Sequence, residues 1–524
     1  MIRFRIPKRR KAEGGIKSRI TIGIYWINNE YGRRDRACPV SKINKTIFKM
    51  KKNIVLLFVL FVVFSACTTT MKQVGVSSLP KNVIQTKVPV RPAGQQHVLG
   101  LVAPKIDTVR IGFIGLGMRG PDAVERMIHI PGVKVVALCD LHVDRVEKVQ
   151  QNILEKNGLP RAAAYSGSAD AWRKLVERDD IDLVYIATDW KTHAEMGVYA
   201  MEQGKHVAIE VPGAMTMEEI WDLINTSERT RKHCIQLENC VYDFFELTTL
   251  NMAQQGVFGE ILYAEGAYIH QLEEFWPYYE GNWRLDYNKK HRGDLYATHG
   301  MGPACQILDI HRGDKMNYLV AMDSKPVSIP AYMEARGEDA TGFQNGQHTM
   351  TMIKTEKGKT IHIQHDVATP RPYSRMYNVA GVNGFASKYP TPGYALKGEV
   401  LNKSGAPELG DLSAHKFMSD EARKALMEQY KHPIQSELEE TARQLGKIAH
   451  GGMDYLMDYR LIYCLRNGLP LDMDVYDLAE WCCLGPLTAI SLENNSAPVE
   501  IPDFTRGHWN DLQGYRHAFV EGRR

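Results

Sequence analysis

Three glycines and one aspartate have the types and the spacing of a nucleotide-binding site. Gly115, Gly117 and Gly120 form the pattern G-x-G-x-x-G, and Asp140 follows 20 residues after the last glycine. In such a pattern the first glycine turns the chain, the second lets the backbone approach a pyrophosphate, and the third lets a helix pack closely on a strand. A carboxylate placed like Asp140 can bind both hydroxyls of an adenosine ribose and repels a 2′-phosphate. The spacing therefore predicts a site for NAD rather than NADP.

Two apolar runs and a helix are expected to position these residues. Residues 109–114 have the length and β-branching of a buried strand, and a second apolar run covers 133–138 and leads to Asp140. The amphipathic stretch between the runs predicts a helix whose free N–H groups and positive dipole face the phosphates. A glycine pattern alone is weakly specific, because glycine-rich turns also occur in α/β domains that bind nothing. Strand, glycines, helix, strand and acid in this order favour the dinucleotide.

The alternation of strands and helices continues to about residue 239. It predicts an α/β fold with an N-terminal Rossmann domain over 106–239, a doubly wound parallel sheet with ligands at the carboxyl ends of its strands. Those ends carry Asp140, the loop 188–193, Glu210-Val211-Pro212 and Glu238-Asn239. The further expected strands are 183–187, 206–210 and 234–237, and the expected helices are 143–157, 169–177, 192–203 and 217–230.

After residue 239 the pattern changes to a helix and longer alternating runs. The runs predict a C-terminal α+β domain over 240–524, built on a largely antiparallel sheet, with a hairpin turn at Lys357-Gly358. The expected strands are 261–270, 318–322, 348–355, 360–365 and 375–382, and the expected helices are 244–254, 421–429, 435–445, 452–466 and 475–492.

The formal net charge of +4 comes from the first residues of the chain. Residues 1–49 carry 14 Lys and Arg against 3 Asp and Glu, without a clear hydrophobic period, whereas residues 67–524 carry a net charge of about −9. Because the basic excess lies outside the expected mature protein, it gives no reason to expect nucleic-acid binding. We expect that translation starts at Met50 and that residues 1–49 come from a wrongly chosen start.

Residues 50–66 have the three parts of a secretory signal peptide: two lysines near the start, an apolar run, and small residues before Cys67. The ending Phe-Ser-Ala-Cys resembles a bacterial lipobox, although Phe64 stands where Leu is usual. We therefore expect an exported lipoprotein that faces the periplasm or the cell surface, anchored to a membrane only through a lipid on Cys67, with a linker over 67–105. A buried internal helix is the alternative, and a true start at Met1 would argue against export.

The nine cysteines predict neither a disulfide framework nor a metal site. No C-x-x-C pair occurs, and Cys482 and Cys483 are adjacent. Clusters of His, Cys and carboxylate residues with metal-ligand spacing are missing from the sequence, so no metal is expected.

The segment Glu210-Val211-Pro212 resembles the glucose–fructose oxidoreductase and inositol dehydrogenase superfamily. Members of that superfamily usually carry Glu-Lys-Pro there, and the lysine helps to move a proton on or off the substrate hydroxyl. Val211 cannot transfer a proton. An NAD-dependent sugar dehydrogenase is therefore the alternative rather than the leading hypothesis.

A closer resemblance extends from about Thr108 to the C-terminus. The stretches that carry it are GLGMRG (115–120), ATDWKTHAEMGVYAMEQGKHVAIEVP (187–212), GNWRLDYNKKHRGDLYATHGMGP (281–303) and HGGMDYLM (450–457). They resemble glycoside hydrolase family 109, whose founding activity is an α-N-acetylgalactosaminidase with tightly held NAD. The resemblance implies a glycosidase that removes terminal α-N-acetylgalactosamine from a glycan or another amino-sugar glycoside, and it leaves a homo-oligomer open.

The resemblance also implies which residues bind the cofactor and the sugar. Beside the three glycines, the cofactor contacts would be Met118, Arg119, Asp140, Trp190, His193, Glu210, Val211 and Asn239. The sugar contacts would be Tyr268, Arg284, Tyr296, Ala297, Thr298, His299 and Tyr377. The first set follows strands of the first domain and the second set belongs to the later domain, so the site is expected between the two.

The family resemblance implies an unusual glycosidase mechanism, because ordinary glycosidases place two carboxylates around the anomeric carbon. Here the sugar would be oxidised at C3 by hydride transfer to NAD, lose its acidified C2 proton, release the glycosidic oxygen from C1, add water and take the hydride back. His299 would be the base or water activator, since a neutral imidazole has a pKa near working pH. Tyr377 would orient the water or pass on a proton. For both residues a packing role is the alternative, and a sugar-binding lipoprotein with an inert nucleotide fold is the third hypothesis for the protein.

Overall fold

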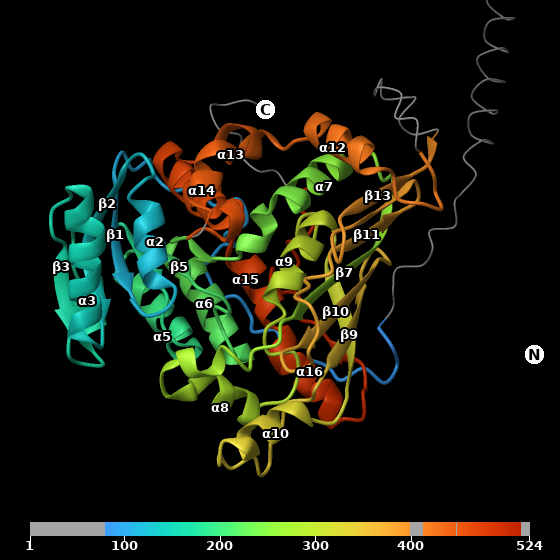
Figure 1. Cartoon of the computed structure of the whole chain (residues 1–524), viewed down its shortest axis with the longest axis horizontal. Helices are drawn as coiled ribbons and strands as arrows, with labels where there is room; N and C mark the ends of the chain where they lie inside the picture. Colours follow the sequence, from blue (N-terminus) through green and yellow to red (C-terminus); the bar gives the residue numbers. More distant parts are fainter. Residues whose placement is uncertain (1–78, 399–411, 447, 515–524) are drawn as a thin grey trace, which may run out of the picture. The chain divides into compact units, whose positions relative to one another are not determined.

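The computed structural model of the chain describes residues 79–398, 412–446 and 448–514 (Figure 1). The expected signal peptide, Cys67 and the first part of the expected linker lie outside these ranges. The described part of that linker forms one isolated bridge, from Ile84 to Val499, and its Arg91 pairs with the buried Glu228 at 3.0 Å. Within the described ranges, no helix is both long enough and apolar enough to cross a lipid bilayer.

Six parallel strands joined by helices form the first sheet. Its order is β3 (Ala163–Ser166), β2 (Val133–Asp140), β1 (Val109–Ile114), β4 (Leu183–Ile186), β5 (His206–Ile209) and β6 (Cys234–Gln236). This is the strand order of the Rossmann fold, so the predicted doubly wound parallel sheet is confirmed. The crossovers are α2 (Gly120–Met127), α3 (Val143–Val149) with η1 (Gln150–Leu154) and η2 (Glu155–Asn157), α4 (Ala171–Val176), α5 (Trp190–Glu202) and α6 (Met217–Thr230).

Strand β2 is two residues longer than predicted because its end pairs with a strand that we did not predict. Cys139 and Asp140 pair with Tyr165 and Ser166 of β3. This four-residue strand is partly exposed at the edge of the sheet and lacks a run of large apolar residues, so the sequence gives no strand signal there. The pairing fixes Asp140 at the carboxyl edge of the sheet.

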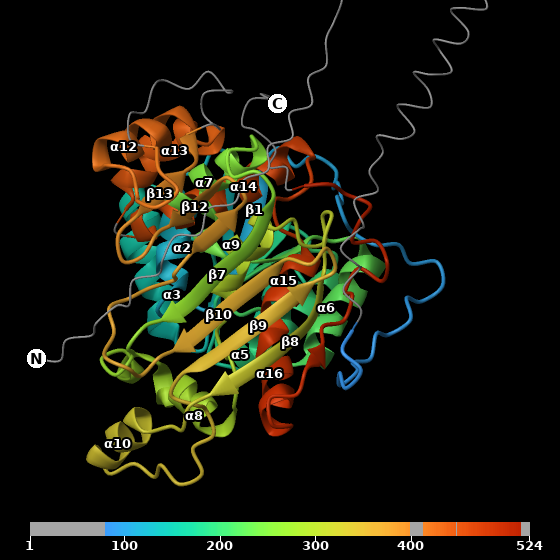
Figure 2. The same cartoon turned by 90° about the vertical axis from the view of Figure 1, so that its right-hand side faces the viewer.

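Eight strands form a second sheet, whose central strands face the viewer in Figure 2. All of its neighbouring strands are antiparallel except β7 and β10, which confirms the predicted α+β domain on a largely antiparallel sheet. The predicted hairpin turn joins β9 to β10, and Gly358 in it has φ +86°. The order is β13 (Gly393–Leu396), β12 (Gly384–Ser387), β11 (Asn378–Gly381), β7 (Ile261–Ile269), β10 (Thr360–Asp366), β9 (Thr349–Thr355), β8 (Met316–Asp323) and β14 (Val499–Glu500).

Two predicted elements of the second domain were wrong in extent. The strand predicted over 375–382 begins only at Asn378, because Met376 and Tyr377 have φ values of 58° and 51° and leave the extended conformation. The helix predicted over 475–492 is two helices, α15 (Val475–Cys482) and α16 (Leu484–Glu493). Pro486 explains the break, because it has no N–H to donate to the carbonyl of Cys482.

Helices α9 (Thr298–Ile307) and α15 lie between the two sheets (Figure 1). Helix α9 packs on β7 and β10, and α15 packs on α9, α6 and β6, so the buried apolar residues of both sheets form one continuous core. The other helices are η3 (Asn239–Tyr242), α7 (Phe244–Gln254), η4 (Trp276–Tyr278), η5 (Glu280–Asn282), α8 (Trp283–Lys290), α10 (Ser328–Ala335), α12 (Asp420–Gln429), α13 (Pro433–Gln444), η6 (His450–Gly452) and α14 (Met453–Asn467).

Two facing glycines let α9 lie directly on β7. A Cβ on Gly266 would lie 2.4 Å from the carbonyl oxygen of Gly300, and a Cβ on Gly300 would lie 2.5 Å from the amide nitrogen of Ala267. Both distances are too short for any side chain, so the two backbones are in direct contact. This contact sets where the first residues of α9 point.

Replacing Gly300 by alanine should therefore destabilise the fold by about 1–3 kcal/mol, the usual cost of overpacking an interior. Urea denaturation followed by circular dichroism measures the change. The matched control is Gly485→Ala in α16, where a Cβ would meet Asp294 O at an ordinary 3.6 Å. Alanine favours a helix over glycine by roughly 0.5–1 kcal/mol, so the control should be neutral or more stable. Equal free energies of unfolding for the two variants would contradict the assigned contact.

Candidate active site

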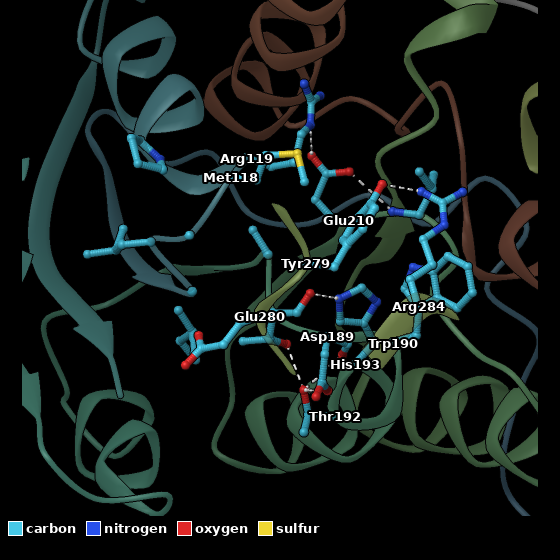
Figure 3. Close-up of a pocket in the computed structure, with 18 of the residues that line it drawn as sticks. Met118, Arg119, Asp189, Trp190, Thr192, His193, Glu210, Tyr279, Glu280 and Arg284 are labelled. Carbon is cyan, nitrogen blue, oxygen red and sulfur yellow. Dashed lines mark hydrogen bonds and ion pairs between the residues drawn. The ribbon is translucent and has the colours of Figure 1, made fainter. Parts of the chain in front are cut away.

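A cavity of about 1280 Å³ opens where the carboxyl ends of the parallel strands meet residues of β7, of α8 and of the turn that precedes α9 (Figure 3). It brings together most of the predicted cofactor residues and most of the predicted sugar residues. The predicted residues that line it are Gly115, Gly117, Met118, Arg119, Asp140, Trp190, His193, Glu210, Val211, Asn239, Tyr268, Arg284, Tyr296 and His299. The predicted residues that do not line it are Gly120, Ala297, Thr298 and Tyr377.

The glycine turn after β1 has the shape of a phosphate cradle. Gly115 has φ +92°, and a Cβ there would lie 2.4 Å from the carbonyl oxygen of Ala187. Gly120 packs under the turn, where a Cβ would lie 1.9 Å from Gly115 O. At Gly117 a Cβ would meet only the Arg145 guanidinium, at 3.7 Å. The turn therefore excludes side chains where the chain packs on itself and leaves room where a pyrophosphate would bind.

Backbone amides hold Asp140 beside this turn. Its Oδ2 accepts the Leu116 N–H at 2.7 Å, and its Oδ1 accepts the His142 N–H at 2.9 Å. The Arg145 guanidinium lies 3.5 Å from Oδ1. The carboxylate lines the cavity where a ribose would follow the pyrophosphate, so the residues present fit NAD.

Arg119 is bonded to acids from two distant parts of the chain. Its Nε donates to Glu210 Oε1 at 3.2 Å (Figure 3), and its Nη2 donates to Asp454 Oδ2 at 3.0 Å. Asn239 donates to the other oxygen of Asp454. Burial acts to raise the pKa of Asp454, but Arg119 and His450 outweigh it and hold that pKa well below its usual value. We did not predict Asp454, and its one signal in the sequence is the stretch HGGMDYLM.

His193 lies within hydrogen-bond distance of both loops that follow β4 and β5. Its Nδ1 lies 2.8 Å from the carbonyl oxygen of Pro212, and its Nε2 lies 3.1 Å from that of Thr188. Burial lowers the pKa of the ring, and a neutral imidazole donates to one carbonyl at a time. His193 thus supports the walls of the cofactor end of the cavity.

An aromatic cage around Arg284 forms another part of the cavity (Figure 3). The guanidinium carbon lies 4.5 Å from the ring centroid of Tyr296 and 4.9 Å from that of Trp190, and Nη1 donates to the Tyr279 hydroxyl at 2.5 Å. Arg284 is 5% exposed, and its Nη2 has no hydrogen-bond partner among the described residues. Because an unpaired buried donor is unfavourable, the cage is suited to a ligand that brings an acceptor.

His299 lies at the start of α9 between Tyr268 and Tyr296, with ring centroids 5.6 and 5.1 Å away. Its Nδ1 is 2.7 Å from Glu238 Oε1, which leaves Nε2 as the ring nitrogen without a partner in the described chain. Burial acts to raise the pKa of Glu238, but His299 and the Cys240 N–H outweigh it and lower that pKa. Glu238 lies two residues after the end of β6, and the sequence does not reveal its pairing with His299 because the two residues are 61 positions apart.

Tyr377 does not reach the cavity, contrary to the expected catalytic role. Its side chain is 3% exposed and packs edge-on against Phe245 in the core, with 6.2 Å between the ring centroids. The left-handed backbone at Met376 and Tyr377 turns the chain at this point. Tyr373 lines the cavity instead.

Ala297 and Thr298 build the start of α9 rather than the cavity wall. The Ala297 carbonyl accepts the N–H groups of Gly300 and Met301, at 3.0 and 2.9 Å. Thr298 is 1% exposed. These two residues set the separation between Tyr296 and His299, which do line the cavity.

The possible ligand atoms of Glu238, Cys240 and His299 lie within 4.8 Å of one another, but the Glu238 carboxylate is engaged by His299 Nδ1 and by the Cys240 N–H. The Cys240 thiol donates to Asn239 Oδ1 at 3.3 Å, and burial raises the pKa of this thiol well above its usual value. A protonated thiol is a poor metal ligand. That the protein needs no metal stays a prediction.

Two protein-family models match the chain, and the boundary between their matches lies just after the first sheet. The model for the oxidoreductase family with an NAD-binding Rossmann fold matches residues 109–237. The model for the C-terminal domain of glycosyl hydrolase 109 matches residues 242–511. The NAD cofactor predicted from the glycine turn is therefore confirmed.

Two solved structures share this fold at low sequence identity. The WlbA dehydrogenase from Bordetella pertussis, in complex with NADH and UDP-GlcNAcA, aligns with a TM-score of 0.54 and 14% identity over 76% of this chain and 100% of its own. An oxidoreductase from Agrobacterium radiobacter, in complex with NAD+, L-tartaric acid and magnesium, aligns with a TM-score of 0.54 and 14% identity over 75% of this chain and 98% of its own. At these identities the likeness establishes the fold.

Two curated proteins are far more similar in sequence. Glycosyl hydrolase family 109 protein 1 of Bacteroides fragilis is 66% identical over 473 residues, which cover 90% of this chain and all of that protein. The glycosyl hydrolase family 109 protein of Porphyromonas gingivalis is 70% identical over 439 residues, 84% of this chain and 93% of its own. The chain therefore belongs to glycoside hydrolase family 109 and is a glycoside hydrolase with an NAD-binding Rossmann domain.

Proposed function

We propose that the protein hydrolyses terminal α-N-acetylgalactosaminides by oxidation, elimination, water addition and reduction of the sugar, with no net consumption of NAD. The observation that carries this proposal is the content of one cavity. It joins the dinucleotide turn to an aromatic cage and to His299, and its described walls offer no free carboxylate.

Each carboxylate that lines the described cavity is already bonded to the protein. A retaining or inverting glycosidase needs two carboxyl groups that are free to act on the anomeric carbon and on water. Four carboxylates line this cavity. Asp140 accepts hydrogen bonds from backbone amides, and Asp189 accepts one from Thr192. Glu210 is bonded to Arg119, and Glu280 is bonded to His142 and Arg145. Their engagement favours a route that breaks the bond without a carboxylate pair.

The chain's own residues would move the protons of this route. His299 has Nδ1 bonded to Glu238, so Nε2 is the atom that would take the C2 proton and later return one. The Tyr268 hydroxyl lies 3.0 Å from His270 Nδ1 and offers a path for the proton of a sugar hydroxyl. Burial and the nearby charge of Arg284 lower the pKa of His270 to about 4, so its ring is a neutral acceptor at working pH.

The remaining residues would bind and orient the sugar. Arg284 Nη2 would donate to the acetyl carbonyl or to a hydroxyl, and the rings of Trp190 and Tyr296 would cover apolar C–H faces. Val211 occupies the place of the superfamily's lysine and is 8% exposed, so it adds only apolar surface. Bound NAD supplies acceptance of a hydride from C3 and its return.

The route predicts exchange at C2 of the sugar. Turnover of an aryl α-N-acetylgalactosaminide in heavy water should place deuterium at C2 of the released sugar while the absorbance of NADH shows no net rise. His299→Ala should lower turnover by about 100-fold or more, the scale of a general base, and leave the NAD content unchanged. Product without deuterium at C2 would rule out elimination. A steady rise of NADH with free sugar would instead support a dehydrogenase.

The cofactor site predicts a second, independent result. Purified protein should release NAD on denaturation, and Asp140→Ala should weaken NAD binding by about 1–3 kcal/mol because charged hydrogen bonds to the ribose are lost. The matched control is Asp144→Ala on α3, whose carboxylate pairs with Lys148 at 2.7 Å on the surface. Equilibrium dialysis with NAD compares the two variants, and equal affinities would argue against the role of Asp140.

We also propose that the protein is exported as a lipoprotein. The support is the pattern of basic, apolar and small residues over 50–66 followed by Cys67, all outside the described ranges. Expressed from Met50 in a Gram-negative host, the protein should incorporate palmitate and partition into membranes. Equal labelling of a Cys67→Ser variant would refute the anchor.

A further inference from the structure

Glu238 is a fully buried carboxylate that contacts His299 without lining the cavity itself. Its Oε1 lies 2.7 Å from His299 Nδ1 and accepts the Cys240 N–H at 3.1 Å, while Oε2 has no partner among the residues described. A Cβ on Gly302 would come within 2.7 Å of Glu238 Cγ, so the Glu238 side chain lies directly against the backbone of α9. His299 and Gly302 are three residues apart on one face of that helix, which fixes the carboxylate against the ring.

The contact has two chemical consequences for the ring. A carboxylate at Nδ1 keeps the proton of the neutral imidazole on Nδ1, so the free lone pair is on Nε2, the nitrogen left for the cavity. A buried carboxylate is also stabilised by a counter-charge, and His299 would supply one to Glu238 once its ring is protonated. Protonation of Nε2 would therefore place an imidazolium against a carboxylate that is already in position.

We propose that Glu238 is the positioning residue of His299, which sets the tautomer of the ring and stabilises its protonated form. The inference rests on the proposed function, in which the sugar carries a ketone at C3. In the proton-transfer step the C2–H bond breaks, the proton forms an N–H bond at Nε2, and the electron pair moves toward the C3 carbonyl oxygen. The pair then consists of the His299 imidazolium and the Glu238 carboxylate, and each charge neutralises the other inside the protein.

No other acid competes for this role within the described surroundings of the ring. The titratable and charged groups that face it from neighbouring elements are Glu238 and Cys240 beside β6, Tyr268 and His270 on or after β7, Tyr296 before α9, and Arg284 of α8 behind the two tyrosines. Glu238 is the one carboxylate in this group. Its replacement by an amide of the same shape should therefore weaken the preference of His299 for the Nδ1–H tautomer and remove the counter-charge of the protonated ring.

The test compares the full-length protein with its Glu238→Gln variant, using histidine labelled with nitrogen-15 in the ring and NMR of the ring nitrogens. The His299 signals are assigned by their loss in His299→Gln. Without the carboxylate, the neutral ring should weaken its preference for the Nδ1–H tautomer and populate the Nε2–H tautomer. The acid limb of the kcat/KM profile should move to lower pH, because the protonated ring then lacks its counter-charge. Turnover should fall by about 100-fold, with NAD content unchanged.

The matched control is another buried carboxylate–histidine pair, Glu480 and His311, which lie 2.9 Å apart away from the cavity. Burial acts to lower the pKa of His311, but Glu480 and its neighbours raise it to about 10. Glu480→Gln should lower that pKa and leave the ring-nitrogen signals of His299, the pH profile and the turnover as in the wild type. This control shows whether the effects of Glu238→Gln come from the contact with His299 itself or from the loss of a buried carboxylate–histidine pair anywhere in the protein.

The outcomes distinguish this inference from the proposed function. If Glu238→Gln does not fold, Glu238→Asp, which shortens the side chain by one methylene, should give the same directions with smaller changes. An unchanged His299 tautomer together with an unchanged pH profile in either folded variant would overturn the role of Glu238. A changed His299 tautomer in a protein that shows no glycosidase activity would support the pairing and refute the proposed function.

Discussion

A set of buried ion pairs between α2 and α14 determines how the rest of the structure is arranged. Arg126 has no exposed surface, its Nε donates to Asp458 at 2.8 Å, and its Nη1 lies 3.5 Å from Asp454. A buried guanidinium without its carboxylates is destabilising by about 3–5 kcal/mol, so the first helix of the Rossmann sheet and a helix from near the C-terminus must meet. Because Asp454 also bonds Arg119, the same requirement shapes the wall of the cavity. The fold and the site therefore depend on one contact between segments more than 300 residues apart.

The two halves of the cavity are built in different ways. At the cofactor end the backbone forms most of the surface: the turn around Gly117 leaves space, and amides orient Asp140. At the other end side chains form the surface, since the cage around Arg284 is built from rings of β7, α5 and the turns beside α8 and α9. In the proposed function, the backbone cradle would hold the cofactor and the side chains would select the sugar.

Much of the fold could be predicted because its signals are local. Except for β3, the strands of the first sheet lie within apolar runs, and the glycine turn depends on residues that are adjacent in the chain. The prediction failed where an element depends on a neighbour in space: β3 is a strand because it pairs with the end of β2, and β11 starts late because Met376 and Tyr377 adopt left-handed backbone conformations. The break at Cys483 has a local cause, because Pro486 has no N–H to donate to the carbonyl of Cys482.

The sequence by itself determined the fold class, the NAD turn and the family, since each rests on contiguous residues whose spacing sets local geometry. It also named Arg284 and His299, but not what surrounds them. Only the tertiary structure decided that Arg284 has no acid partner in the described chain, that Glu238 holds Nδ1 of His299, and that Tyr377 packs in the core while Tyr373 lines the cavity. The physical reason is that burial and charge pairing depend on which distant segments pack together, and local residue patterns do not reveal that packing.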